Sequence, residues 1–183
     1  MLITPNDRLA MLDYINPRGG RCVEVGVFQG DFSEEILKRE PSSLYLVDPW
    51  LSQSPEVYPD DHANVRAQSK FDAIHASVVE RFKDKPVCVV RQPSYEAAQG
   101  FANGYFDFAY IDAIHTFESC LCDCLSWWPK VKSGGWLCGH DYTGKYVGVR
   151  LAVDAFQRLT GKKLILMTQE PWASWGIKKW PLE

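Results

Sequence analysis

The sequence lacks any long apolar stretch. None of its 183 residues lies in a run approaching the roughly 20 consecutive apolar residues that cross a bilayer. The first residues, MLITPND, have neither the basic region nor the long apolar region of a signal peptide. Six cysteines are too few for a disulfide scaffold. We therefore expect a cytoplasmic protein without a membrane partner.

Basic charge is also scarce. The 20 Lys and Arg residues are outnumbered by 23 Asp and Glu residues, which gives a net charge of −3, and the basic residues form no run. Such a chain has no positive field with which to hold a phosphate backbone. We expect no nucleic-acid partner and a small-molecule substrate, and a homo-oligomer stays open.

Strand-like and helix-like segments alternate along the chain. Short, non-alternating apolar runs are typical of parallel strands buried on both faces, and helix-spaced apolar residues separate most of them. The last two runs have no helix between them, which predicts an antiparallel strand near an edge. We expect one α/β domain over 1–183, with a helical extension at 1–20 and a core at 21–183. The predicted strands are 21–25, 44–47, 87–90, 106–111, 136–138, 163–168 and 174–178.

Capping residues predict where the helices begin. Thr4, followed by Pro5, predicts the start of the first helix, and Asp31 predicts the start of the second. Helix-spaced apolar residues predict further helices over 63–82 and 116–128. The polar segment 51–62 is a candidate lid, with an ordinary surface loop as the alternative.

A glycine-bearing turn follows the first predicted strand. Residues 23–30 read VEVGVFQG, in which Gly26 and Gly30 are four positions apart. This spacing is not the G-x-G-x-x-G of dinucleotide sites, and the carboxylate of Glu24 would repel a diphosphate. The same carboxylate suits a ligand with a positive amino group. The alternative is that the glycines only form a turn and that Glu24 is solvated.

Asp48 adds a second indication. It ends the second predicted strand, eighteen residues after Gly30. An acidic residue at this position accepts hydrogen bonds from ribose hydroxyls in nucleotide-binding α/β folds. A ribose joined to a cationic amino-acid tail describes S-adenosylmethionine, which we predict as the cofactor.

Acidic and histidine residues follow the fourth and fifth predicted strands. Asp112 ends the fourth strand, and His140 and Asp141 end the fifth. Two carboxylates and an imidazole that converge on one crevice suit Mg²⁺ or a similar divalent cation. The pattern favours a metal site over the alternative, in which Asp112 orients a loop and His140 bonds to the backbone.

Five motifs together resemble one enzyme family. They read VEVGVFQG at 23–30, VDPW at 47–50, YIDAIH at 110–115, WWP at 127–129 and GGWLCGHDY at 134–142. In this order they resemble the class I S-adenosylmethionine-dependent methyltransferases, specifically the small family that includes sugar and antibiotic-tailoring O-methyltransferases. The last motif is the most specific.

The resemblance implies a fold and a cofactor site. The fold is a Rossmann-like doubly wound sheet of seven strands, in the order 3-2-1-4-5-7-6 with strand 7 antiparallel, inside three α/β/α layers. Glu24 and Gly26 are expected at the methionine part of the cofactor, Asp48 at the ribose, and Gln92 and Ser94 at the adenine. The expected cofactor-binding residues are Glu24, Gly26, Gly30, Asp48, Gln92, Ser94 and Asp112.

The resemblance also suggests catalytic residues. Metal-dependent relatives have an acid after strand four and an acidic pair after strand five, where this chain has Asp112 and then His140 with Asp141. Relatives often carry another acid two residues after the first, where this chain has Ile114. His115 is the nearest replacement as a general base, and a structural role for it is equally supported. We expect Asp112 and His115 to be catalytic, and Asp112, His140 and Asp141 to hold the metal.

The predicted function is S-adenosylmethionine-dependent O-methylation of a small hydroxylated acceptor of sugar or phenol type. Whether a divalent cation assists the reaction is left open by the sequence. One alternative is a non-catalytic interaction module with the cofactor fold. Another is a metal-dependent hydrolase that uses the same acids. A hydrolase has no need of Glu24 and Asp48, which argues against it.

Overall fold

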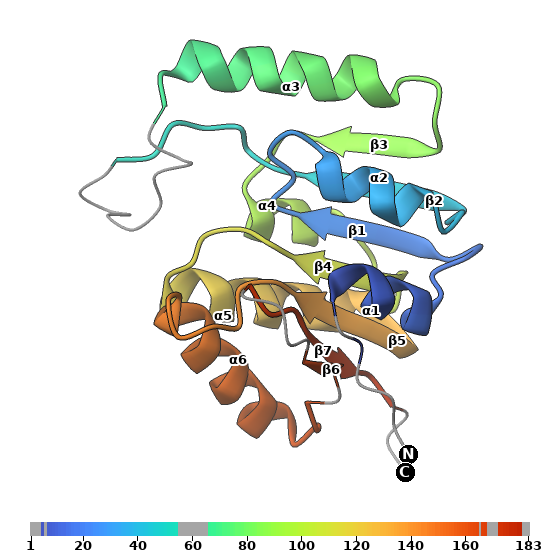
Figure 1. The fold of residues 1–183 in the computed structure, drawn as a ribbon, viewed down its shortest axis with the longest axis vertical. Helices are drawn as coiled ribbons and strands as arrows, with labels where there is room; N and C mark the ends of the chain where they lie inside the picture. The colour runs from blue at the N-terminus through green and yellow to red at the C-terminus, as the bar shows by residue number, and fades with distance from the viewer. Residues whose placement is uncertain (1–4, 6, 55–65, 165, 168–171, 181–183) are drawn as a thin grey trace.

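The computed structural model describes residues 5, 7–54, 66–164, 166–167 and 172–180. A central sheet runs through the molecule and is covered by helices (Figure 1). The helices are α1 (Arg8–Ile15), α2 (Asp31–Leu37), α3 (Gln68–Phe82), α4 (Ser94–Gln99), α5 (Phe117–Trp127), the short 3-10 helix η1 (Trp128–Lys130) and α6 (Val147–Thr160). The strands are β1 (Arg21–Val25), β2 (Ser43–Val47), β3 (Val87–Val90), β4 (Phe106–Ile111), β5 (Val131–Gly139), β6 (Leu166–Met167) and β7 (Trp175–Lys178).

The sheet is mostly parallel. The strands lie in the order β3-β2-β1-β4-β5-β7-β6. The strand β1 pairs in parallel with both β2 and β4, whereas β7 pairs antiparallel with β5 and β6. The predicted Rossmann-like α/β architecture is therefore confirmed. The direction of strand order changes between β1 and β4, and ligands of such sheets bind in the crevice at that point.

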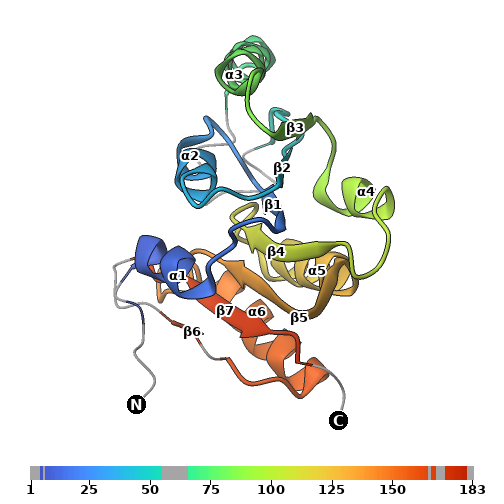
Figure 2. The same cartoon turned by 90° about the vertical axis from the view of Figure 1, so that its right-hand side faces the viewer.

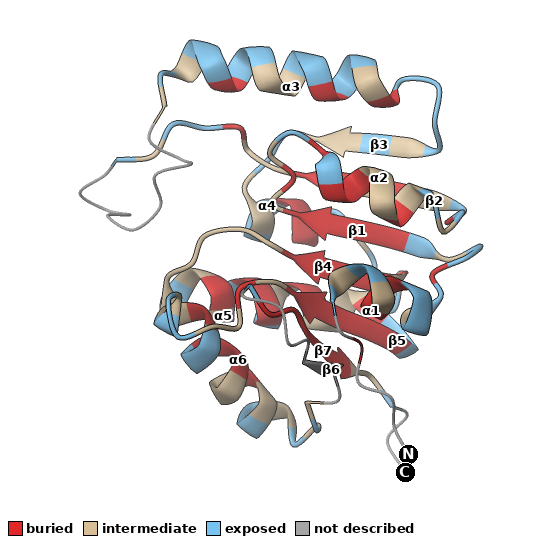
Figure 3. Cartoon of the chain, in the orientation of Figure 1, coloured by how far each residue is buried: buried red, intermediate tan, exposed pale blue. Residues whose placement is uncertain are grey.

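Helices cover both faces of the sheet. Figure 2 shows α1 and α2 on one side and α4 and α5 on the other. The buried residues form two clusters that follow this division: α1, α2 and α3 pack in one cluster, and α4, α5 and α6 in the other. Consecutive residues of β1 alternate between them, with Cys22 in the first and Val23 in the second. The inner strands are buried, whereas the outer faces of the helices are exposed (Figure 3).

The first two helices do not begin where their predicted caps indicate. The helix α1 begins later in the chain, at Arg8, and α2 begins one residue earlier, at Asp31. Asp7 caps α1, because its Oδ1 accepts hydrogen bonds from the backbone N–H of Leu9 (2.9 Å) and Ala10 (2.7 Å). The predicted cap Thr4 lies outside the described residues. Gly30, in a left-handed conformation (φ 82°), caps α2, so Asp31 is the first helical residue.

Other predicted boundaries also shift. The strand β5 starts at Val131 and runs through both glycines, because its first part continues the pairing with β4. Residues 163 and 164 lie outside β6. Positions 55–62 of the candidate lid and 63–65 of the predicted long helix lie outside the described residues. Among the described helices, none is both long and apolar enough to cross a membrane.

The short helix α1 is anchored to the face of the sheet. Met11 and Leu12 are fully buried, in the same cluster as Phe108 and Tyr110 of β4. Tyr14 makes an edge contact with Trp136 of β5, with ring centroids 6.1 Å apart. Residues near the beginning of the chain thus pack on strands from its second half.

Leu12→Ala should therefore destabilise the fold by about 2–5 kcal/mol, the usual cost of truncating a buried leucine. Leu9→Ala is the matched control on the same helix, because Leu9 is 38% exposed, and it should cost less than about 1 kcal/mol. Urea unfolding measures both values. Equal losses would show that burial in the cluster does not hold α1.

The carboxyl ends of β1, β2 and β4 are joined by backbone hydrogen bonds around Gly26. The N–H of Gly26 donates to Val47 (2.9 Å), and the N–H of Asp112 donates to Val25 (2.7 Å). Gly26 has φ +87°, and a Cβ at this position would stand 1.9 Å from the carbonyl oxygen of Asp112. Only glycine allows the two segments to approach this closely.

Gly26→Ala tests this close approach. Gly19 is the control, since it also has a positive φ (+69°) but no atom within 4 Å of an added Cβ. Gly19→Ala should cost about 1–2 kcal/mol through backbone strain alone. Gly26→Ala should cost at least about 2 kcal/mol more, because the strand ends must separate. Urea unfolding of the two variants gives the comparison, and equal costs would contradict the close contact.

Candidate functional site

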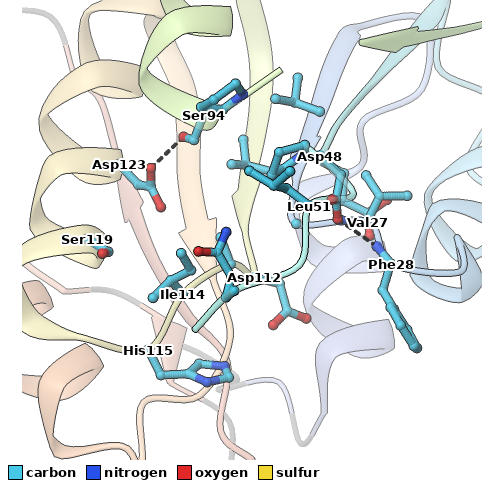
Figure 4. Close-up of a pocket in the computed structure, with 18 of the residues that line it drawn as sticks. Val27, Phe28, Asp48, Leu51, Ser94, Asp112, Ile114, His115, Ser119 and Asp123 are labelled. Atoms are coloured by element: carbon cyan, nitrogen blue, oxygen red, sulfur yellow. Dashed lines mark hydrogen bonds between the residues drawn. The ribbon is translucent and has the colours of Figure 1, made fainter. Parts of the chain in front are cut away.

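A cavity of about 640 Å³ opens at the carboxyl ends of β1, β2 and β4 (Figure 4). Its walls come from the turns that follow these strands and from residues of α4 and α5. Predicted site residues that line it are Glu24, Gly26, Asp48, Ser94, Asp112 and His115. Gly30, Gln92, His140 and Asp141 are not among the described lining residues. Six of the ten predicted site residues thus line one cavity, although they come from segments far apart in the chain.

Asp48 organises the glycine-bearing turn. Its Oδ2 accepts hydrogen bonds from the backbone N–H of Val27 (2.9 Å) and Phe28 (3.0 Å), and its Oδ1 accepts one from Trp50 (2.7 Å). Burial raises the pKa of Asp48 above its usual value, although these three bonds oppose the shift. Trp50 Nε1 in turn donates to the carbonyl of Phe28 (2.8 Å). The acid after β2 therefore fixes the shape of the turn after β1.

Glu24 is a buried carboxyl group at the end of β1. Its side chain is 2% exposed, and its Oε2 accepts a hydrogen bond from Ser33 Oγ in α2. Burial raises the pKa of Glu24 to about 8, and the bond from Ser33 only partly offsets this. The alternative of a solvated Glu24 is thus excluded, and a cationic ligand group beside it would favour the ionised form.

Four residues form what we call the acid–histidine cluster: Asp112, His115, His140 and Asp141. Asp141 lies between the two imidazoles, with its Oδ2 2.9 Å from His115 Nε2 and its Oδ1 3.3 Å from His140 Nδ1. His140 Nδ1 is also 3.7 Å from Asp112 Oδ2. The His115 ring stacks on Tyr146, with centroids 4.0 Å apart. The turns after β4 and β5 therefore meet as predicted.

The environment separates the two carboxyl groups of the cluster. Burial raises the pKa of Asp112 to about 6, and the charge of His140 opposes this. Burial acts in the same sense on Asp141, but hydrogen bonds from His115 and His140 outweigh it and hold its pKa well below the usual value. Burial disfavours the charge on His140, yet its contacts with Asp141 and Asp112 raise its pKa overall. Asp141 is thus the ionised partner of the imidazoles.

The cluster offers a set of metal-binding atoms. One ligand atom each from Asp112, His115 and Asp141 lies within 4.8 Å of the others. Two carboxylate oxygens and an imidazole nitrogen are suitable donors for Mg²⁺ or Mn²⁺. The sequence assigned His140 as the nitrogen ligand and His115 as the base, whereas this converging set contains His115.

Sequence reasoning missed Asp123 on the cavity wall. This carboxyl group of α5 is 6% exposed and accepts a hydrogen bond from Ser94 Oγ, which itself accepts one from Trp127 Nε1 (2.9 Å). Burial raises the pKa of Asp123 to about 7. A signal was present, because Asp123 lies three residues after Cys120 and four before Trp127, on the buried face of the helix.

Arg8 was also missed. It lines the cavity from α1, a helix that the sequence placed in an extension outside the core. A signal existed in its spacing, since Arg8 precedes Met11 and Leu12 by about one helical turn and so shares their face. The direction in which that face points was not predictable from the helix alone.

The fold and the sequence match known methyltransferases. Residues 23–142, more than half of the chain, match the family model described as "Methyltransferase domain". A putative methyltransferase from Streptococcus mutans in complex with SAH is similar, with a TM-score of 0.67, 13% identity and coverage of 98% of this chain and 99% of that one. A putative rRNA-methylase from Clostridium thermocellum has a TM-score of 0.68, 12% identity and coverage of 97% and 100%.

A third solved structure, the ribosomal protein L11 methylase from Lactobacillus delbrueckii subsp. bulgaricus, has a TM-score of 0.65, 14% identity and coverage of 94% of this chain and 77% of that one. No curated protein matches the chain. At these identities the solved structures establish the fold, and the family match rests on the motifs between the first strand and the fifth. The chain therefore belongs to the methyltransferase-domain family and is a class I S-adenosylmethionine-dependent methyltransferase.

Proposed function

We propose that this enzyme methylates an oxygen atom of a small hydroxylated acceptor, of sugar or phenol type. The observation that carries the proposal is the acid–histidine cluster, which reaches the same cavity that Glu24 and Asp48 line. A hydroxyl group is a poor nucleophile until it loses its proton, and the cluster offers groups that can hold one.

The cavity suits the cofactor in size and in polarity. Its volume of about 640 Å³ falls within the range of roughly 300–1,000 Å³ found for small-molecule sites. Glu24 would bind the ammonium group of the amino-acid end. Asp48 would accept a hydrogen bond from a ribose hydroxyl. A carboxylate has about four lone-pair directions, and backbone hydrogen bonds occupy three of them. Gly26 lets the turn approach the ligand.

The adenine part is assigned to the opposite wall. Ser94 and Asp123 lie there, joined by a hydrogen bond, and offer both hydroxyl and carboxyl groups. Two residues were predicted to contact the adenine, Gln92 and Ser94. Gln92 is exposed and is not among the described residues that line the cavity, so the adenine contact is assigned to Ser94. Gly30 contributes indirectly, by starting α2 behind the turn.

S-adenosylmethionine supplies a methyl group on a sulfonium, so the C–S bond breaks as the new O–C bond forms and the acceptor hydroxyl releases one proton. Positioning the acceptor oxygen in line supplies much of the rate. His115 would take up the proton at its Nδ1, because its Nε2 already lies 2.9 Å from Asp141 Oδ2. Asp141 would stabilise the imidazolium that results.

A divalent cation fits the donor set of the cluster. Asp112 and Asp141 would hold it, with His140 as the predicted nitrogen ligand and His115 as the one in the converging set. Such an ion would lower the pKa of an acceptor hydroxyl. A His115 side chain that binds the metal cannot also act as the general base. Whether turnover depends on a divalent cation therefore distinguishes the metal-ligand role of His115 from the role of general base.

The buried Glu24 makes cofactor binding depend on pH. Its pKa of about 8 keeps it mostly protonated at pH 7, yet it must ionise to attract an ammonium group. Affinity should therefore rise as the pH increases towards 8, by up to about tenfold per unit. Calorimetry at pH 7 in two buffers of different ionisation enthalpy should detect release of about one proton on binding.

Glu24→Gln should abolish this proton release and weaken binding. Asp123→Asn is the control, because it removes another buried carboxyl group of the cavity with a raised pKa, and it should keep most of the release. Binding by the wild type without proton release would contradict the role of Glu24.

The acid–histidine cluster is tested through methyl transfer. Transfer to a panel of sugars and phenols, followed by mass spectrometry, should give O-methylated products. Asp112→Asn should lower turnover by at least about a hundredfold, a larger loss than its effect on SAH binding, to which Asp112 is also expected to contribute. Asp107→Asn is the control, because Asp107 lies near the opposite end of the same strand and pairs with Lys132, and it should retain turnover.

Other outcomes identify the rival functions. Cofactor binding without turnover across the panel would favour a non-catalytic module, and hydrolytic activity without the cofactor would favour a hydrolase. Full turnover after removal of divalent cations by EDTA would leave His115 as the base and exclude the metal.

A further inference from the structure

Arg8 places a positive charge in an otherwise acidic cavity. It is the one Lys or Arg among the described lining residues. The other charged groups there are mostly carboxyl groups, which belong to Glu24, Asp31, Asp48, Asp112, Glu118 and Asp123. A single guanidinium in such surroundings is suited to bind an anionic group of a ligand.

The position of Arg8 is fixed by its neighbours. Asp7, the residue before Arg8, caps α1, and Met11 and Leu12 anchor the next turn of this helix in the core. The guanidinium carbon lies 4.9 Å from the centroid of the Phe32 ring, and that ring packs on Tyr110 with centroids 4.3 Å apart. A guanidinium held over an aromatic face loses less freedom when it binds a ligand.

Arg8 stands close to the end of the cavity formed by Glu24. Phe32, on which the guanidinium lies, directly precedes Ser33, and Ser33 donates its hydrogen bond to Glu24. The positive charge of Arg8 also lowers the pKa values of Glu24 and Asp112, against the larger effect of burial. The cavity therefore has an acidic and a basic side chain at the same end.

We propose that Arg8 binds the carboxylate of the cofactor's amino-acid end, while Glu24 binds its ammonium group. An amino acid carries both charges on one carbon atom, so neighbouring groups of opposite sign are complementary to it. The inference rests on the proposed placement of the amino-acid end at Glu24. It makes α1 part of the cofactor site, and Arg8 a binding residue that selects a cofactor with an intact carboxylate.

The test compares two ligands that differ only in this carboxylate: S-adenosylhomocysteine and its decarboxylated analogue. Calorimetry should show that Arg8→Gln weakens binding of S-adenosylhomocysteine by about ten- to hundredfold. Binding of the decarboxylated analogue should change by less than about threefold, since it has no group for Arg8 to hold. Arg8→Lys should give an intermediate loss for the first ligand, because it keeps the charge without the planar fork.

Arg66→Gln is the matched control. The Arg66 guanidinium carbon also lies 4.9 Å from a phenylalanine ring, that of Phe28, but Arg66 is not among the described lining residues. This variant should bind both ligands as the wild type does. If Arg8→Gln does not fold, Arg8→Lys provides the same two-ligand comparison.

Two results would overturn the inference. One is an equal loss for both ligands, which would indicate a structural role for Arg8. The other is no loss for either, and a raised KM for the acceptor in that case would assign Arg8 to an acidic acceptor. Failure of the wild type to bind S-adenosylhomocysteine at all is a different result, since it would overturn the proposed function as well.

Discussion

The site depends on the close approach of two backbone segments, at Gly26 and at Asp112. A side chain at position 26 would overlap the carbonyl oxygen of Asp112, so glycine is required for the ends of β1 and β4 to meet. This contact sets the distance between the cofactor turn and the acid–histidine cluster. Asp48 then holds the turn through three backbone hydrogen bonds. Backbone packing at Gly26 and the Asp48 side chain therefore together position the turn relative to the acid–histidine cluster.

Buried carboxyl groups in and beside the cavity have different properties because their neighbours differ. Glu24 and Asp123 are buried with one hydroxyl hydrogen-bond partner each, so burial dominates and their pKa values rise. Asp141 is equally buried but lies between two imidazoles, and its pKa falls. Groups with raised pKa gain their charge when a cation arrives, whereas Asp141 is charged beforehand. Buried carboxyl groups can thus serve both the proposed binding role of Glu24 and the proposed catalytic role of Asp141.

The sheet was predictable because its strands are encoded locally. The apolar runs at 21–25 and 106–111 have the bounds of β1 and β4. The residues that follow the first, second and fourth strands include Gly26, Asp48 and Asp112, which were expected at one cofactor site. Features that depend on how helices dock were less accessible. Asp7 rather than Thr4 caps α1, and the side chains that α1 and α5 turn towards the cavity follow from their packing on the sheet. Local sequence defines which face of a helix is apolar, but the sheet decides what that face is next to.

The contacts of α1 also have a consequence for the order of folding. This helix packs on β4 and on Trp136 of β5, about a hundred residues further along the chain, so its docking closes a long loop. During synthesis, Phe32 follows Arg8 closely, but α1 cannot pack on β4 and Trp136 until the second half of the sheet has been made. A partial chain that already contains β1, β2 and the glycine turn therefore lacks one wall of its cavity. The helix α1 is therefore made before the strands on which it packs, and it docks only after they have formed.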